Sequence, residues 1–124
     1  MALARLKITP RTRSELAVFL GVAVTAGVWE ELLYRGFLMW FLLPAGVAAA
    51  VIGSSLIFGL GHAYQGGRGI LVTAAVGLVF AIAYALTTSL WWLMLAHALV
   101  DIYGGIAAYR LHRLIPPEPE SFAA

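Results

Sequence analysis

Long apolar runs alternate with short polar breaks along the chain, and this pattern predicts helices of membrane-spanning length. Each of the main runs approaches the roughly 20 residues that an apolar helix needs to cross a bilayer. The helices are expected at four places, over residues 14–43, 45–62, 70–86 and 90–111. The pattern therefore predicts an all-α fold, a polytopic membrane helix bundle with about four transmembrane helices around a polar cavity.

Four kinds of helix boundary separate these runs. Ser14 followed by Glu15 is typical of the first turn of a helix, and Pro44 is expected to end the first run. The Gly66-Gly67-Arg68-Gly69 segment is expected to be a turn that closes the second helix. A tight polar turn is expected at Thr87-Thr88-Ser89, before the last run.

The composition is typical of an integral membrane protein. Of the 124 residues, 62% are hydrophobic and 11% are charged, and the mean hydropathy is +0.91. Soluble domains are about half apolar and a quarter charged, so the expected partner is the lipid bilayer and not nucleic acid. The absence of cysteine excludes a thiol nucleophile and a thiolate metal site.

Positive charges predict the topology. They gather in a basic arm over residues 1–13, at Arg68, and at Arg110 and Arg113, where a flexible tail over 113–124 is expected to begin. With four crossings, the positive-inside rule places both termini in the cytoplasm. We therefore expect a multi-pass integral membrane protein, in the plasma (inner) membrane.

Three ionisable residues lie in the middle of the first apolar run. Glu30 and Glu31 are adjacent, and Arg35 follows the second glutamate by four residues. Each such charge costs about 2.5–3.5 kcal/mol in hydrocarbon, which makes these residues functional candidates. Residues four apart share a helix face, so Glu31 is expected to pair with Arg35. Glu30 then has no partner on its own helix and is the carboxylate that can take a proton from water.

Two further motifs carry histidines into apolar runs. Phe58-x-x-x-His62 ends the second predicted helix, and His97-x-x-x-Asp101 lies inside the fourth. Asp101 is expected to accept a hydrogen bond from one ring nitrogen of His97 and so fix its tautomer. Carboxylates and imidazoles buried together are typical of acid–base or metal chemistry.

Depth along the helices sets a condition on this site. Glu30 and His97 are expected roughly 20 Å from the cytoplasmic face, whereas His62 is expected at only about 5 Å. The three can meet only if the second helix ends deep in the membrane. The 63–69 segment must then line a water-filled cavity, where irregular backbone is tolerated.

The ordered motifs resemble the CPBP family, which comprises the CAAX proteases and the bacteriocin-processing or immunity proteins of the Abi domain. The resemblance covers roughly residues 15–110, within a core over 14–112. It implies an intramembrane endopeptidase acting on membrane-associated peptides, such as prenylated CAAX proteins or bacteriocin and pheromone precursors. The residues that it implies are catalytic Glu30, His62, His97 and Asp101, with Glu31, Arg35 and Phe58 in supporting roles.

The same resemblance assigns the chemistry and exposes two departures. Glu30 and His62 would activate water, and His97 with its partner would stabilise the oxyanion. The partner here is Asp101 where eukaryotic enzymes carry asparagine, so this side chain must be protonated or must orient His97. The family usually has more helices before the glutamates, so we expect a shortened form or a homo-oligomer.

Other proteases remain as alternatives. Two histidines and a glutamate form a known zinc set, but the chain has no His-Glu-x-x-His motif, and a metal would consume Glu30 as a ligand. We therefore expect no cofactor, with zinc as the alternative. An aspartyl protease would need two aspartates. A serine protease would need Ser54 or Ser55, although serines in membrane helices usually bond to the backbone.

Two non-proteolytic functions also fit the pattern. A bacteriocin-immunity or membrane-scaffold protein could bind a peptide through the same cavity without catalysis. Chains of carboxylates and histidines also mark proton or cation paths, although four helices without internal repeats disfavour a transporter.

Overall fold

The computed structural model describes residues 9–114, and the regular elements within that range are all helical. They are α1 (Arg13–Glu31), the π-helix η2 (Leu32–Leu38), α2 (Met39–Leu42), the 3-10 turn η3 (Leu43–Ala45), α3 (Val47–Gly61), the 3-10 turn η4 (Ala63–Gln65), α4 (Gly66–Thr87) and α5 (Trp91–Leu114). The first four elements run on as one helix of 33 residues. The parts of the predicted arm and tail at 1–8 and 115–124 lie outside the described residues.

The first helix begins and ends through local chemistry. Thr12 is its N-cap, because the Thr12 hydroxyl accepts from the Glu15 N–H while the Glu15 carboxylate accepts from the Thr12 N–H. This reciprocal pair is a capping box, and it corrects the start expected at Ser14. The break expected at Pro44 is confirmed, since a 3-10 turn follows there and Gly46 has a φ of +102°.

The turn expected at Gly66–Gly69 is wrong. The chain reverses earlier, through η4, and Gly66 takes up a φ of +80° as the first residue of α4. Glycine adopts this left-handed backbone without a steric penalty, so the reversal needs only one of the four predicted turn residues. The polar turn after α4 is confirmed, with Thr88 at a φ of +51°. At the other end, α5 continues to Leu114, three residues beyond the expected end of the last helix at residue 111.

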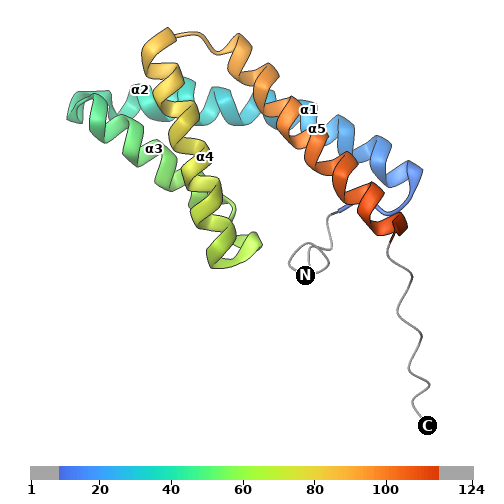
Figure 1. The fold of residues 1–124 in the computed structure, drawn as a ribbon. Coiled ribbons are helices and arrows are strands. Elements are labelled where there is room, and N and C mark those ends of the chain that lie inside the picture. Colours follow the sequence, from blue (N-terminus) through green and yellow to red (C-terminus); the bar gives the residue numbers. More distant parts are fainter. Residues whose placement is uncertain (1–8, 115–124) are drawn as a thin grey trace.

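Two pairs of helices make most of the contacts between elements. α1 packs along α5, α3 packs along α4, and α2 packs against α3 (Figure 1). Glycines permit the close approaches, because a Cβ at Gly27 would lie 2.8 Å from the Ala98 nitrogen, and one at Gly59 would lie 2.8 Å from the Ile70 oxygen. Small residues of this kind let membrane helices pack backbone to backbone. The middle of the long helix therefore lies where the α1–α5 pair meets the α3–α4 pair.

Three of the helices are long enough and apolar enough to cross a membrane. They cover Arg13–Ala45, Ala63–Thr87 and Trp91–Leu114, whereas α3 has only 15 residues. At 1.5 Å per residue α3 spans about 22 Å, short of a hydrocarbon core of about 30 Å. The count of four full crossings is thus approximate, and the cytoplasmic placement of the termini stays a prediction.

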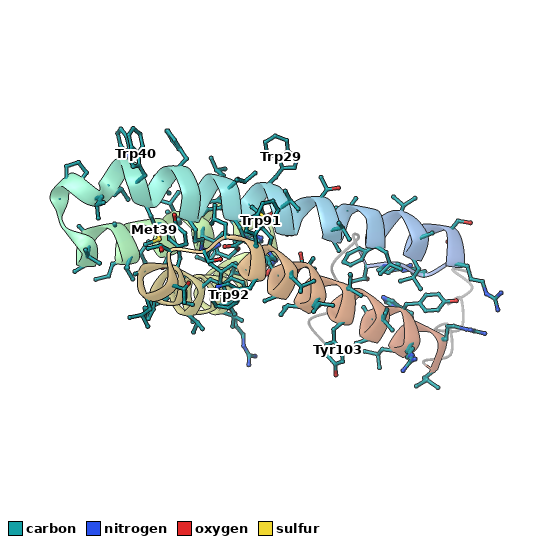
Figure 2. All side chains as sticks on the ribbon, turned by 90° about the horizontal axis from the view of Figure 1, so that it is seen from above. Trp29, Met39, Trp40, Trp91, Trp92 and Tyr103 are labelled. Atoms are coloured by element: carbon teal, nitrogen blue, oxygen red, sulfur yellow. The ribbon has the colours of Figure 1, made fainter. Side chains whose placement is uncertain are left out.

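Apolar side chains cover the outside of the molecule. Trp29 and Trp40 are each 67% exposed, and in Figure 2 both point away from the other helices. A small apolar cluster of Met39, Ala50, Val51 and Ala81 lies inside, yet the largest fully buried side chains include Arg35 and Glu31. An apolar exterior around a buried charged pair is the arrangement of an integral membrane protein.

Candidate active site

The two glutamates end α1, and the π-helix η2 begins directly after them at Leu32. Arg35 lies within η2, which is seven residues long. π-Helical segments are rare and occur frequently at functional sites. The spacing of apolar residues does not predict this segment, because seven residues are too few to disturb the helical periodicity of the long run.

Glu31 and Arg35 form the buried ion pair that their spacing predicts. Arg35 Nη1 donates to Glu31 Oε1 at 2.8 Å, and the two side chains are 1% and 0% exposed. Arg35 Nη2 donates to the backbone oxygen of Gly77 on α4 at 2.9 Å. A Cβ at Gly77 would lie 2.8 Å from a Phe58 ring carbon and 3.4 Å from Arg35 Nη2, so the arginine reaches α4 because this residue has no side chain.

Two aromatic rings enclose the guanidinium group. The Arg35 Cζ atom lies 4.6 Å from the centre of the Phe58 ring and 5.4 Å from that of Phe80. A cation over an aromatic face is stabilised by the negative face of the ring, more strongly when both are desolvated. Phe58 thus contacts the predicted ion pair directly. Phe80 was not among the predicted residues, although it shares a helix face with Gly77 three residues before it.

His97 is held by Glu31. Its Nδ1 lies 2.7 Å from Glu31 Oε1, the same oxygen that accepts from Arg35. An oxygen paired with a guanidinium belongs to an ionised carboxylate, so Nδ1 carries the proton and donates it. The other ring nitrogen, Nε2, faces Glu30 Oε2 and Asp101 Oδ2, each at 3.7 Å.

The role expected of Asp101 in fixing the His97 tautomer is therefore wrong. At 3.7 Å, Asp101 Oδ2 is beyond hydrogen-bond range, and it faces Nε2 and not Nδ1. The physical reason lies in helix packing. Because α5 runs against α1, Nδ1 of the ring points at the long helix, where the Glu31 carboxylate is nearer than the one on its own helix.

His62 lies near Glu30 as well, and it comes from the end of α3. It caps the C-terminus of α3, and its Nδ1 lies 2.9 Å from the Phe58 oxygen. A carbonyl only accepts, so Nδ1 carries the proton and Nε2 is left facing Glu30 Oε2 at 3.8 Å. The meeting of His62 with Glu30 and His97 satisfies the condition set by depth, because α3 is short and ends beside the middle of the long helix.

A cavity of about 160 Å³ opens beside these groups. Its wall includes Glu31, Arg35, His62, His97 and Asp101. The candidate serine nucleophiles lie elsewhere: Ser54 and Ser55 both donate to the Val51 oxygen, at 3.2 and 2.6 Å, as expected of serines in a membrane helix. The cavity thus combines carboxylates and imidazoles without a serine.

A family model for type II CAAX prenyl endopeptidases, described as Rce1-like, matches residues 12–103. The match covers most of the chain and spans every predicted site residue from Glu30 to Asp101. The chain belongs to this family. No curated protein and no solved structure matches it. As a member of the Rce1-like family it is a CAAX-type intramembrane protease, which confirms the resemblance drawn from the motifs.

The spacing of the ionisable groups in the Rce1-like site differs from that of a zinc site. Tetrahedral zinc, with bonds of about 2.0–2.1 Å, holds its ligand atoms about 3.3 Å apart. Glu30 Oε2 lies 3.8 Å from His62 Nε2 and 3.7 Å from His97 Nε2, which is wider. Among residues 9–114 no three His, Asp or Glu side chains are grouped so as to hold a metal ion. The residues in this arrangement do not fit zinc. That the protein needs no metal stays a prediction.

The sequence reasoning missed four residues around the site. Gly77 accepts through its backbone, which side-chain patterns do not reveal. Phe80 packs beside Arg35 and His97, with its ring centre 5.7 Å from that of His97. Gln65 and Thr73 line the cavity, and the one available signal was that Gln65 is the only side-chain amide in the sequence.

Proposed function

We propose that the chain hydrolyses a peptide bond near the C-terminus of a prenylated CAAX-type substrate, with Glu30 as the general base. One observation carries the proposal. Glu30 Oε2 is buried, makes no hydrogen bond to any described residue, and lies 3.7–3.8 Å from the Nε2 atoms of His62 and His97. A buried carboxylate oxygen that lies near two imidazoles and bonds neither supports a chemical role for Glu30.

These spacings suit a water molecule as nucleophile. They exceed a direct hydrogen bond, and they are shorter than two hydrogen bonds end to end, so they match a water that bridges Glu30 Oε2 to one of the two histidines. In the proposed step Glu30 takes a proton from this water while the water oxygen attacks the carbonyl carbon of the scissile bond. The C=O electron pair moves to oxygen, and the tetrahedral species collapses by expelling the amine. The amine takes the proton back from Glu30.

His97 and Asp101 would stabilise the oxyanion. Because Glu31 holds Nδ1, a protonated His97 ring presents Nε2–H to the cavity as a donor. Asp101 faces the same nitrogen and is 37% exposed, so it can approach the same oxygen as a protonated acid. His62, with its proton on Nδ1, would accept a second hydrogen bond from the water and orient it.

The substrate part of the proposal rests on the family and the setting. The candidate residues lie on helices with apolar outer faces, so a soluble peptide would not reach them easily. A lipid-modified C-terminus would bring the scissile bond to the membrane. Bacteriocin or pheromone precursors would remain the alternative if the lipid made no difference.

The test is hydrolysis by purified protein in liposomes, using a fluorogenic farnesylated CAAX peptide and its unprenylated twin. We expect cleavage of the farnesylated peptide only, at a rate unchanged after exhaustive chelation. Equal cleavage of both peptides would remove the prenyl requirement. Stoichiometric zinc, with activity lost on its removal and restored on its return, would overturn the metal-free mechanism.

A further inference from the structure

The cavity wall formed by η4 and α4 carries two polar side chains that the proposed chemistry does not use, Gln65 and Thr73. Thr73 Oγ1 donates to Gln65 Oε1 at 3.3 Å, and Gln65 Nε2 donates to the Tyr64 hydroxyl at 3.2 Å. The side-chain amide of the exposed Gln65 therefore has one hydrogen-bond partner for its oxygen and one for its nitrogen.

Gly69 makes room for this conformation. A Cβ at Gly69 would collide with the Cβ of Gln65, so the glutamine lies over the first turn of α4 only because glycine is there. Any side chain at position 69 would push the amide away from this place. Space at Gly69 and hydrogen bonds to Thr73 and Tyr64 together favour this orientation of the Gln65 amide at the cavity wall.

The hydrogen-bonding capacity that remains on Gln65 matches a peptide unit. A side-chain amide has two N–H donors and two oxygen lone pairs. Tyr64 and Thr73 use one of each, which leaves one donor and one acceptor. A peptide backbone offers one C=O and one N–H per residue, in the complementary pattern.

We propose that Gln65 binds the backbone of an extended substrate segment within the cavity, a proposal that rests on the peptidase function above. A scissile bond must leave helical structure to be attacked, and its neighbours then lose their backbone partners. In the hydrocarbon region no water is present to bond these groups, so leaving them unpaired is unfavourable. A neutral amide replaces those bonds for any side-chain sequence. It therefore selects extended peptides with a free N–H at one position and rejects proline or N-methylated residues there.

The experiment is a double cycle on the purified protein in liposomes. A series of farnesylated CAAX peptides, each N-methylated at one residue, is assayed with the wild type and with Gln65→Leu, which keeps the bulk but not the hydrogen bonds. We expect Gln65→Leu to raise KM about tenfold on the unmodified peptide with little change in kcat. At one peptide position, N-methylation should raise KM similarly in the wild type and add nothing in the variant.

Two further variants test how the amide is held. Thr73→Val releases Gln65 Oε1 and should raise KM several-fold. Thr87→Val should not, because the hydroxyl that it removes lies away from the cavity, where it donates to the Ala83 oxygen and accepts from the Trp92 indole N–H. Gly69→Ala should reproduce the effect of Gln65→Leu, and it keeps the test open if the leucine variant folds poorly.

The outcomes separate this proposal from the function on which it rests. If the wild type cleaves no peptide, the proposed function fails. If it cleaves and Gln65→Leu leaves KM unchanged, or if the losses from N-methylation and from the variant add at every position, the role of Gln65 is overturned and the peptidase stands.

Discussion

Two polar regions meet at His97, and they differ in how their groups are bonded. The polar lock comprises Glu31, Arg35, the Gly77 carbonyl and His97 Nδ1, joined at 2.7–2.9 Å. The open site comprises Glu30 Oε2, Asp101 Oδ2 and the Nε2 atoms of the two histidines, with separations of 3.7–3.8 Å.

The difference separates positioning from reaction. Buried charges that are paired at hydrogen-bond distance fix geometry, because any movement breaks a bond in a medium of low dielectric. Groups aimed at a common point but held apart can accept a reactant between them. His97 belongs to both regions, so the lock sets the direction in which its free nitrogen faces. Adjacent glutamates can therefore have different roles, because Glu31 bonds two partners through one oxygen and Glu30 bonds none among the described residues.

The largest expected effect comes from Glu30→Gln. The amide keeps the shape of the side chain but cannot take a proton, so hydrolysis should fall by about 10²–10⁴-fold, the usual contribution of a general base. Thermal unfolding in detergent should change little, because Glu30 has no hydrogen bond to lose within residues 9–114. If the variant cleaves the farnesylated peptide at near wild-type rate, Glu30 is not the general base, and the proposed difference between the two glutamates is wrong.

Arg35→Gln should instead act on stability. It leaves the Glu31 carboxylate buried beside His97 without its cation, and breaking a buried pair typically costs about 3–5 kcal/mol. We expect a lower unfolding temperature and a lower yield. The double variant with Glu31→Gln should recover part of the loss, since it removes the uncompensated charge. A single variant as stable as the wild type would show that the lock does not hold the helices.

The lock was half predictable from the sequence. The pairing of Glu31 with Arg35 follows from a spacing of four on a helix, which is a local property. Glu31 also contacts His97, which lies 66 positions further along the chain, and Arg35 contacts Gly77, which lies 42 positions further. Helical periodicity tells which face a residue occupies, but not which neighbour meets that face. The sequence therefore predicts for Asp101 the contact with His97 that Glu31 makes.

The fold shows the same limit. The long apolar runs predicted the helices, whereas the 3-10 turn η4 and the early start of α4 at Gly66 were missed. Glycine-rich sequence permits a turn at several positions, and the choice depends on packing, here on Gln65 lying over Gly69. The candidate catalytic residues were all visible as ionisable groups in apolar runs. Their convergence could only be stated as a condition on the length of the second helix.

Glu31→Gln sharpens the comparison because it removes the charge from the polar lock but keeps a hydrogen-bonding side chain there. The amide oxygen can still accept from His97 Nδ1, but the charge that pairs with Arg35 is gone. We expect kcat to fall by about 10–10²-fold, less than for Glu30→Gln, together with a lower unfolding temperature. Steady-state kinetics and thermal unfolding, measured on the same preparations, distinguish the two glutamates. A variant with wild-type stability and no activity would place Glu31 among the catalytic residues.

The smallest effect is expected at Asp101, where the structure separates two roles that the sequence left open. If Asp101 oriented His97, the amide would give the wrong tautomer, and such errors reduce hydrolase rates by about 10⁴-fold. Since Glu31 holds Nδ1, Asp101→Asn should instead lower kcat by less than about tenfold, because an amide N–H can donate to the oxyanion as a protonated acid does. Asp101→Ala should lose more, because it has no donor. Measuring kcat for both variants on the farnesylated peptide decides the matter: a large loss in the asparagine variant would return the orienting role to Asp101, and full activity in the alanine variant would remove Asp101 from the open site.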